Sequence, residues 1–255
     1  MSDLAVGWGP RRLLGRRYLF SIGGRAVPAY PAMLYLGCVS GVFAGAAAAG
    51  RTGVDRTHVA SAMIVLLVPA FVGARLLFVL QHVEMFRADH GRIWRRSDGG
   101  SALYGGLLLS TGMSVPLLAA WDIPFWGFWD AASVTMLVGL IFTRFGCLLH
   151  GCCAGRATSG RLGVWLPDHA GVWKRRWPTP LLEAAWASLI LAYVQASHGS
   201  HVAGDRYATV VAAYAAGRLV LETTREGDGA RLGRTSNLAL SAALLAAAGA
   251  VVVIR

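Results

Sequence analysis

The sequence predicts an all-α membrane protein, a polytopic bundle of about seven transmembrane helices. Of its 255 residues, 55% are hydrophobic and only 15% are charged, whereas a soluble domain has roughly 25% charged residues. Long stretches carry no charge, and a helix that spans a bilayer needs about 20 mostly apolar residues. The remaining charge is lopsided, with 24 Lys and Arg against 13 Asp and Glu, a net charge of +11. The composition therefore argues against a water-soluble globular fold.

Seven segments have the length and apolar character of membrane spans. Two of them carry isolated charges: segment 123–150 contains Asp130 and Arg144, and segment 207–221 contains Arg218. The other five are free of charge, although the apolar character of segment 57–74 continues beyond Arg75 to Val83. These five segments are 26–50, 57–74, 99–121, 184–204 and 235–254.

The connections between the seven segments are short, which leaves no room for a separate soluble domain. We therefore predict one transmembrane domain, residues 26–255. Residues 1–25 contain five arginines, and the apolar part between them is too short and broken for a signal peptide. We interpret residues 1–25 as a basic arm that lies at the membrane interface.

The basic residues are divided unevenly between the two faces of the membrane. Seventeen fall in the N-terminal arm and in the second, fourth and sixth loops, whereas four fall on the opposite face and three inside spans. The positive-inside rule would place the face with seventeen charges, together with the N-terminus, in the cytoplasm.

Three arginines inside the spans, Arg75, Arg144 and Arg218, lie toward the basic face. Each costs at least about 2.5 kcal/mol at the centre of a span, so a function is expected of them. Guanidinium groups gathered in a watery cavity would suit a phosphate. The alternatives are snorkelling to the headgroups or structural pairing with Glu222, Glu183 or Asp130.

Four segments carry local signatures. Paired glycines in the second would let the backbone approach a ligand closely. The segments are FSIGGRAVPAY (20–30), SDGGSALYGGLLLS (97–110), TRFGCLLHGCCAGR (143–156) and YAAGRLVLETTREGD (214–228), the last preceded by RWPTPLLE (176–183).

In this order and spacing, the motifs resemble those of the prolipoprotein diacylglyceryl transferase family, from about Phe20 to the C-terminus. The resemblance implies transfer of the diacylglyceryl group of phosphatidylglycerol to the thiol of a lipobox cysteine in preprolipoproteins. It implies a bacterial inner-membrane enzyme whose partners are this lipid and the signal peptides of preprolipoproteins. We expect no cofactor.

The resemblance also assigns residues. Arg144 and Arg218 match the two functional arginines of the family and would hold the lipid phosphate, and Tyr30 matches a tyrosine near the headgroup. Gly105 and Gly106 would admit the substrate, and Arg75 would join the binding site. Glu222, four residues after Arg218 on a helix, would orient it or form a plain helix pair with it.

The chain departs from the family pattern at chemically important positions. Tyr104 stands where the pattern has His, and a phenol, with a pKa near 10, is a poor base at neutral pH. We expect Tyr104 to be catalytic by bonding the phosphate or relaying a proton. Otherwise a phosphate oxygen or His150 would take the thiol proton. Trp177 and Pro180 replace the His and Gln of the family pattern.

Three cysteines, Cys147, Cys152 and Cys153, crowd beside His150. Cys147 replaces an Asn of the pattern and Cys152 a Glu. A soft metal, a disulfide and simple space filling are the alternatives, and we expect no metal because no second cluster completes a zinc site.

The resemblance to the family implies that the active-site loops lie on the outer face of the membrane, against the charge count. We follow the family, because loops that serve an anionic lipid have a reason to be basic. Two other functions remain open: a divergent paralogue that uses another acceptor or only binds anionic lipid, and an anion transporter with an arginine ring. Nucleic-acid binding is not expected, because the charges are scattered over membrane loops.

Overall fold

The computed structural model describes residues 18–50, 53–87, 91, 102–167, 171–197, 202–225 and 231–254. Seven helices of 18 or more residues confirm the predicted all-α bundle, and a short helix, α3 (Val83–Arg87), follows the second. The seven long helices are α1 (Ala29–Ala49), α2 (Arg56–Gln81), α4 (Leu103–Ala120), α5 (Phe125–His150), α6 (Thr179–Ala196), α7 (Asp205–Glu222) and α8 (Arg231–Ile254).

Within the described residues, four helices are long and apolar enough to cross a membrane by length and composition: α1, α2, α4 and α5. In α8, the apolar stretch Asn237–Gly249 is shorter. Helices α6 and α7 contain Glu183, Arg218 and Glu222, three of the charged residues of the site described below.

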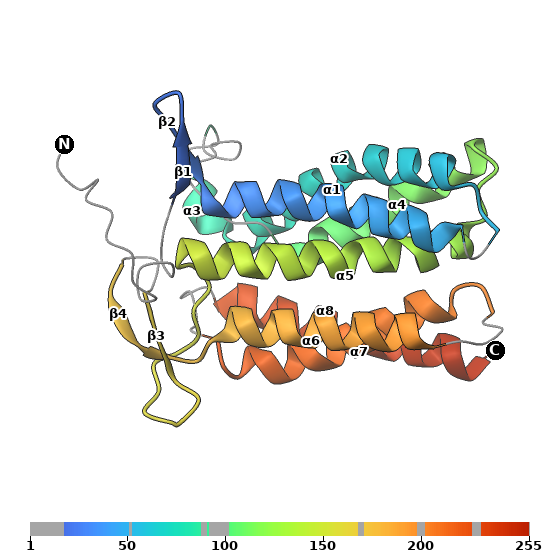
Figure 1. The fold of residues 1–255 in the computed structure, drawn as a ribbon. Coiled ribbons are helices and arrows are strands. Elements are labelled where there is room, and N and C mark those ends of the chain that lie inside the picture. Colours follow the sequence, from blue (N-terminus) through green and yellow to red (C-terminus); the bar gives the residue numbers. More distant parts are fainter. Residues whose placement is uncertain are drawn as a thin grey trace.

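The long helices run along a common axis in two groups (Figure 1). In one group α1 packs along α5 and α2 along α4, and in the other α7 packs against α6 and α8. Helix α5 also contacts α6 and α7, so it joins the two groups. One apolar cluster fills the first group, and a second lies between α5, α6 and α7.

Small residues allow the helices of the first group to approach closely. Gly37, Gly41 and Gly45 repeat every four residues on α1, and a Cβ at any of them would come within about 3 Å of α5, at Phe142, Thr135 or Ala131. Gly73 of α2 meets Gly105 of α4 in the same way, since a Cβ on either would lie less than 2.4 Å from the carbonyl oxygen of the other.

Two β-hairpins lie at one end of the bundle (Figure 1). Strands β1 (Tyr18–Ile22) and β2 (Arg25–Pro28) are antiparallel. Gly23 and Gly24 form the two-residue turn between them with φ of 55° and 77°, a conformation that favours glycine. The end of the predicted arm is thus a hairpin, and residues 1–17 lie outside the described residues.

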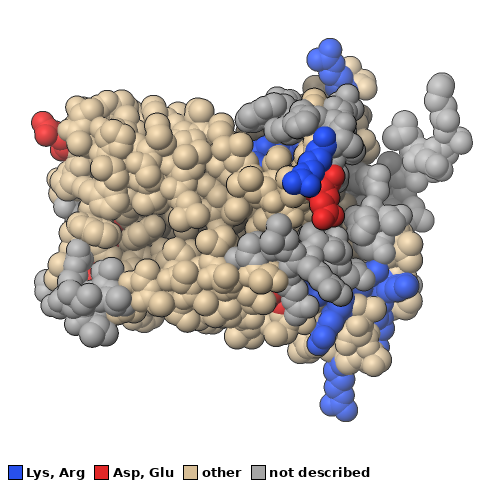
Figure 2. Space-filling model, turned by 180° about the vertical axis from the view of Figure 1, so that it is seen from behind, with Lys and Arg blue, Asp and Glu red and all other residues tan. Residues whose placement is uncertain are grey.

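The second hairpin, β3 (Val164–Pro167) with β4 (Trp173–Arg176), follows α5 and leads into α6. Helix α6 begins five residues before the predicted apolar segment, because Pro180 occupies its first turn, where a missing N–H costs nothing. Most of the described Lys and Arg side chains gather at this hairpin end (Figure 2). The uneven charge predicted between the two faces is therefore visible in the folded molecule.

Candidate functional site

The candidate site lies at the hairpin end of the bundle, where α5 and α7 finish. Helix α5 ends at Gly151, whose φ of 76° is the left-handed conformation common after a helix, and Gly151 N–H donates to the carbonyl of Cys147. Arg144 is therefore about two turns before the end of α5, and Arg218 is one turn before the end of α7. Both arginines therefore lie near the ends of α5 and α7 that reach the basic end of the bundle, as predicted.

Glu183, in the second turn of α6, joins three arginines from three parts of the chain. Arg218 Nη1 donates to Glu183 Oε1 at 2.7 Å and Arg225 Nη1 donates to the same oxygen at 2.9 Å. Arg144 Nε forms an ion pair with the other oxygen, Glu183 Oε2. The Glu183 side chain is only 2% exposed, so its carboxylate is held by these guanidinium groups rather than by water.

Glu222 forms the second acidic member of the cluster. Its Oε2 lies 3.1 Å from Arg218 Nη2 and 3.9 Å from Arg225 Nε. Three guanidinium groups therefore face two carboxylates, which leaves one positive charge in excess with both carboxylates ionised. A partly buried cationic excess of this kind favours an anionic ligand, and planar guanidinium forks match phosphate oxygens. We call Arg144, Glu183, Arg218, Glu222 and Arg225 the arginine cluster.

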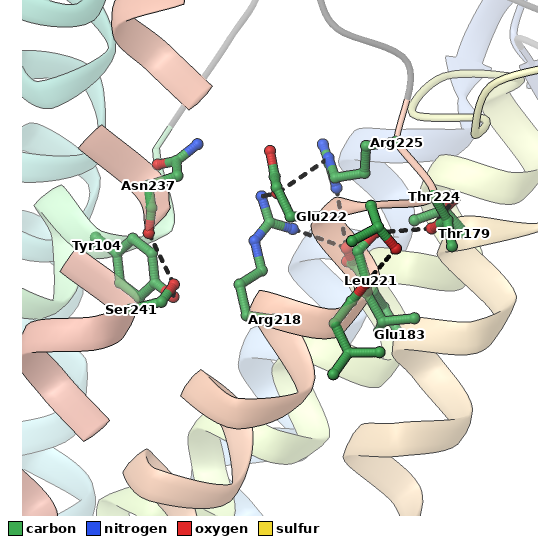
Figure 3. A network of polar contacts seen from close by, with 12 residues as sticks. Tyr104, Thr179, Glu183, Arg218, Leu221, Glu222, Thr224, Arg225, Asn237 and Ser241 are labelled. Atoms are coloured by element: carbon green, nitrogen blue, oxygen red, sulfur yellow. Dashed lines mark hydrogen bonds and ion pairs between the residues drawn. The ribbon is translucent and has the colours of Figure 1, made fainter. Parts of the chain in front are cut away.

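Backbone hydrogen bonds of Gly155 and Arg156 bring the motifs of the sequence together around this cluster. Gly155 N–H donates to the carbonyl of Trp177 and Arg156 N–H donates to that of Thr224, both at 2.9 Å. A Cβ at Gly155 would lie 2.4 Å from Thr179 Oγ1, so a larger residue does not fit there. Thr179 in turn lies 3.0 Å from Thr224, oxygen to oxygen (Figure 3). Segments 143–156, 176–183 and 214–225 thus form one unit.

Tyr104 lies on the other side of Arg218, on α4 (Figure 3). Its hydroxyl is 2.5 Å from Ser241 Oγ, and Ser241 donates its only proton to the carbonyl of Asn237 at 2.7 Å. With the Ser241 proton on Asn237, Tyr104 is the donor to Ser241, and its oxygen lone pairs are then available as acceptors. Arg218 and Glu222 are close enough to act electrostatically on Tyr104.

Two other residues singled out from the sequence, Tyr30 and Arg75, are not members of the arginine cluster. Tyr30 lies at the start of α1 against Gly146, within electrostatic reach of Arg144 and Cys147. Arg75 lies against two aromatic rings of its own region, with Cζ 5.5 Å from the ring centroids of Phe78 and Phe86. The third arginine on Glu183 is Arg225 rather than Arg75, because the chain after α7 turns back over the end of α6.

Gly105 and Gly106 are buried, and their faces are turned to α2. A Cβ at Gly105 would lie 2.2 Å from the carbonyl oxygen of Gly73, and one at Gly106 would lie 2.6 Å from that of Ala70. Their small size therefore lets α4 approach α2, and this contact sets the position of Tyr104 on the preceding residue.

The three clustered cysteines meet beyond the end of α5. The sulfur atoms of Cys147, Cys152 and Cys153 all lie within 4.8 Å of one another, which makes them a group that could hold a metal ion. All three are free thiols. His150 is not part of this group, and its Nδ1 is buried without a hydrogen-bond partner among the described residues.

Three participants were not singled out from the sequence as site residues: Glu183, Arg225 and Ser241. The argument that selected the arginines also applies to Glu183, a carboxylate that directly precedes an uncharged segment. Arg225 stands inside a quoted motif but was counted only as a loop charge. Ser241 has no local signal, since it is one small polar residue in an apolar helix. The segment DGGS (98–101) of the second motif lies outside the described residues.

Comparison with known proteins gives consistent results. A family model described as prolipoprotein diacylglyceryl transferase matches residues 17–255. A phosphatidylglycerol–prolipoprotein diacylglyceryl transferase of Rhodopirellula baltica is 31% identical over 150 residues, 56% of this chain and 30% of the relative. The Lactiplantibacillus plantarum enzyme of that name is 30% identical over 187 residues, 69% of this chain and 66% of the relative. The Clostridium tetani enzyme of that name is 25% identical over 219 residues, which are 82% of this chain and 85% of the relative. The matched region therefore covers less than two thirds of the full length of the first two relatives.

Proposed function

Because this chain belongs to the prolipoprotein diacylglyceryl transferase family, we propose that it transfers the diacylglyceryl group of phosphatidylglycerol to the lipobox cysteine of preprolipoproteins. The observation that carries the proposal is the arginine cluster, with its single excess positive charge near the end of the bundle. Phosphatidylglycerol has one negative phosphodiester, so the lipid would neutralise this excess.

The proposed reaction is a displacement at a glycerol carbon. The sulfur of the lipobox cysteine bonds to this carbon, the carbon–oxygen bond to phosphate breaks, and glycerol phosphate leaves with the bonding electron pair. The thiol gives its proton to an oxygen of the phosphate, since the thiolate is the effective nucleophile. The breaking carbon–oxygen bond adds a second negative charge to the phosphate, and the proton and the fixed cations stabilise that developing charge.

Six residues of the site have proposed roles in this step. Arg144 and Arg218 bind and neutralise the phosphate, while Glu183 and Glu222 hold the two guanidinium groups in place. Tyr104, whose own proton is engaged with Ser241, offers an oxygen that accepts a hydrogen bond from the incoming thiol. Tyr30, which packs against Gly146 within electrostatic reach of Arg144, would contact the headgroup.

The location follows from the substrate. Preprolipoproteins are exported, so the proposed enzyme acts in the bacterial inner membrane with its hairpin end on the outer face. Basic loops at this end would attract the anionic lipid headgroups.

A transfer assay tests the proposal. Purified protein is given phosphatidylglycerol and a lipobox peptide, and mass spectrometry detects the added diacylglyceryl group. We expect product with the unmodified protein and a loss of at least about 100-fold with Arg144→Ala or Arg218→Ala, because each removes a donor to the developing charge. Arg56→Ala, at the exposed far end of α2, is the matched control and should leave activity unchanged.

Alanine at either position also leaves Glu183 underpaired, so the variants need a folding check. Arg144→Lys and Arg218→Lys retain the positive charge but lose the planar fork. We expect these variants to unfold at nearly the same temperature as the unmodified protein and still to lose about tenfold or more in rate. Full activity in both lysine variants, or no product with the unmodified protein, would contradict the proposal.

A second candidate is suggested by Tyr104, since a phenol stands where the family pattern has His. The site would then bind anionic phospholipid, or transfer its group to another acceptor, without modifying a lipobox peptide. Saturable binding of phosphatidylglycerol that depends on Arg144 and Arg218, with no peptide product, would favour this candidate.

A further inference from the structure

The turn after α5 gathers three thiols that the proposed transfer does not use. Cys147 is in the last turn of α5, and Cys152 N–H donates to the Cys147 carbonyl at 3.0 Å. This contact, made possible by the left-handed Gly151, folds the chain back on the helix end. Consequently all three sulfur atoms lie within 4.8 Å of one another, although four residues separate Cys147 from Cys152.

The backbone of Cys153 is in an unfavourable conformation. Its φ is +61°, and only one other described residue besides glycine, Asp122, has a positive φ. A residue with a Cβ occupies this region at a cost of order 1 kcal/mol or more, and such strain is concentrated at ligand sites. The strained conformation brings the third sulfur into the group.

We propose that Cys147, Cys152 and Cys153 bind a soft, thiophilic ion of the Cu(I) class through three thiolate sulfurs. A trigonal site with metal–sulfur bonds of about 2.3 Å has sulfur atoms about 4 Å apart. The observed separations, up to 4.8 Å, are within a small side-chain rotation of this value. From the sequence alone we expected no metal here, because no second cluster completes a zinc site.

The donor set selects the ion. Thiolate ligands favour Cu(I), Zn(II) and iron–sulfur clusters over hard cations. A structural zinc site needs four ligands, and no His, Asp or Glu joins the three sulfurs among the described residues. Three soft ligands without a fourth therefore fit a low-coordinate monovalent ion better than zinc.

Charge and exposure also suit the site. The guanidinium groups of Arg144 and Arg225 act electrostatically on Cys153, so their positive charge offsets part of the negative charge of a site with three thiolates. A thiolate is the form that ligates metals. Exposure increases along the group, with Cys147 buried, Cys152 half-buried and Cys153 exposed, so an ion can enter from the surface and be held at the end of α5.

Competition for Cu(I) tests the proposal without any lipid transfer, so its result is independent of the proposed function. Reduced protein is titrated anaerobically with Cu(I) in the presence of a chromophoric Cu(I) chelator. We expect one equivalent bound, with X-ray absorption showing three sulfur neighbours at about 2.3 Å. Replacing only an outer-shell partner of a metal ligand costs 10- to 100-fold in affinity, so Cys147→Ser, Cys152→Ser and Cys153→Ser should each cost at least about tenfold.

Cys38→Ser is the matched control, because Cys38 is a half-buried free thiol on α1 outside the group. It should bind Cu(I) as the unmodified protein does. Equal affinity in the three cluster variants would overturn the proposal, as would a sulfur count below three. Fewer than four reactive thiols in protein unfolded without reductant, restored by a reductant, would identify a disulfide instead and would also overturn it.

Discussion

Glu183 is the residue on which the arginine cluster depends. Its two oxygens contact Arg144, Arg218 and Arg225, and no other carboxylate among the described residues contacts Arg144. Removing one partner of a buried ion pair is costly, because the other charge stays buried without compensation. With the Glu183 charge removed, three guanidinium groups would face Glu222 alone.

We therefore expect Glu183→Gln to lower the free energy of unfolding by about 3 to 5 kcal/mol. The amide is nearly the same size, so the loss reports the charge rather than the packing. Thermal unfolding in detergent measures the effect. Glu84→Gln, on the exposed surface of α3, is the control and should leave the midpoint unchanged. An equal midpoint for both variants would show that the cluster contributes nothing to stability.

At the scale of elements, the contact of α2 with α4 positions Tyr104. Gly73 and Gly105 face each other there, and each is too close to the opposite carbonyl oxygen for a side chain. Close helix contacts through small residues are a main source of association energy in membranes. Since Tyr104 directly precedes Gly105, a displacement of α4 would also move the hydroxyl away from Ser241.

Gly105→Ala should force α4 away from α2 and lower the unfolding temperature, because its Cβ would lie 2.2 Å from the Gly73 oxygen. Gly112→Ala is the matched control on the same helix, where a Cβ meets nothing within 4 Å. Alanine is the better helix former by about 1 kcal/mol, so this variant should be neutral or more stable. Thermal unfolding of the two variants side by side gives the answer, and equal stability would exclude a tight crossing at Gly105.

At the scale of the whole molecule, charge, hairpins and site coincide at one end. The cytoplasmic assignment from the basic loops and the outer assignment from the proposed function make opposite predictions for this end. Two exposed residues of similar accessibility distinguish them: Trp165 on β3, 59% exposed, and Val202 before α7, 60% exposed. Strand β3 and the segment that leads into α7 lie at opposite ends of the bundle (Figure 1).

In a variant whose four native cysteines are replaced by serine, we expect an impermeant thiol reagent to label Trp165→Cys on intact spheroplasts. Val202→Cys should be labelled only after the membrane is opened, because it would lie on the cytoplasmic side. The reverse pattern would place the hairpin end inside the cell and contradict the orientation in the proposed function.

Much of this architecture follows from local sequence. The seven long helices agree with the seven apolar segments, because a backbone inside lipid must satisfy its own hydrogen bonds and helices are the simplest way to do so. The two hairpins were not predicted, although Gly23–Gly24 is a turn signal. Arg144 and Arg218, both singled out from the sequence, lie together in one polar cluster, whereas the guanidinium group of Arg75 lies against Phe78 and Phe86.

The sequence by itself determined the number of long helices, the uneven charge of the two ends and the presence of arginines inside the spans. These are properties of single segments in a medium without water. Only the tertiary structure decided that one carboxylate serves three arginines, two of them 35 and 42 residues away, and that three thiols meet at one helix end. Such contacts depend on how closely helices approach and how the chain turns between them, and no local pattern of residues specifies either.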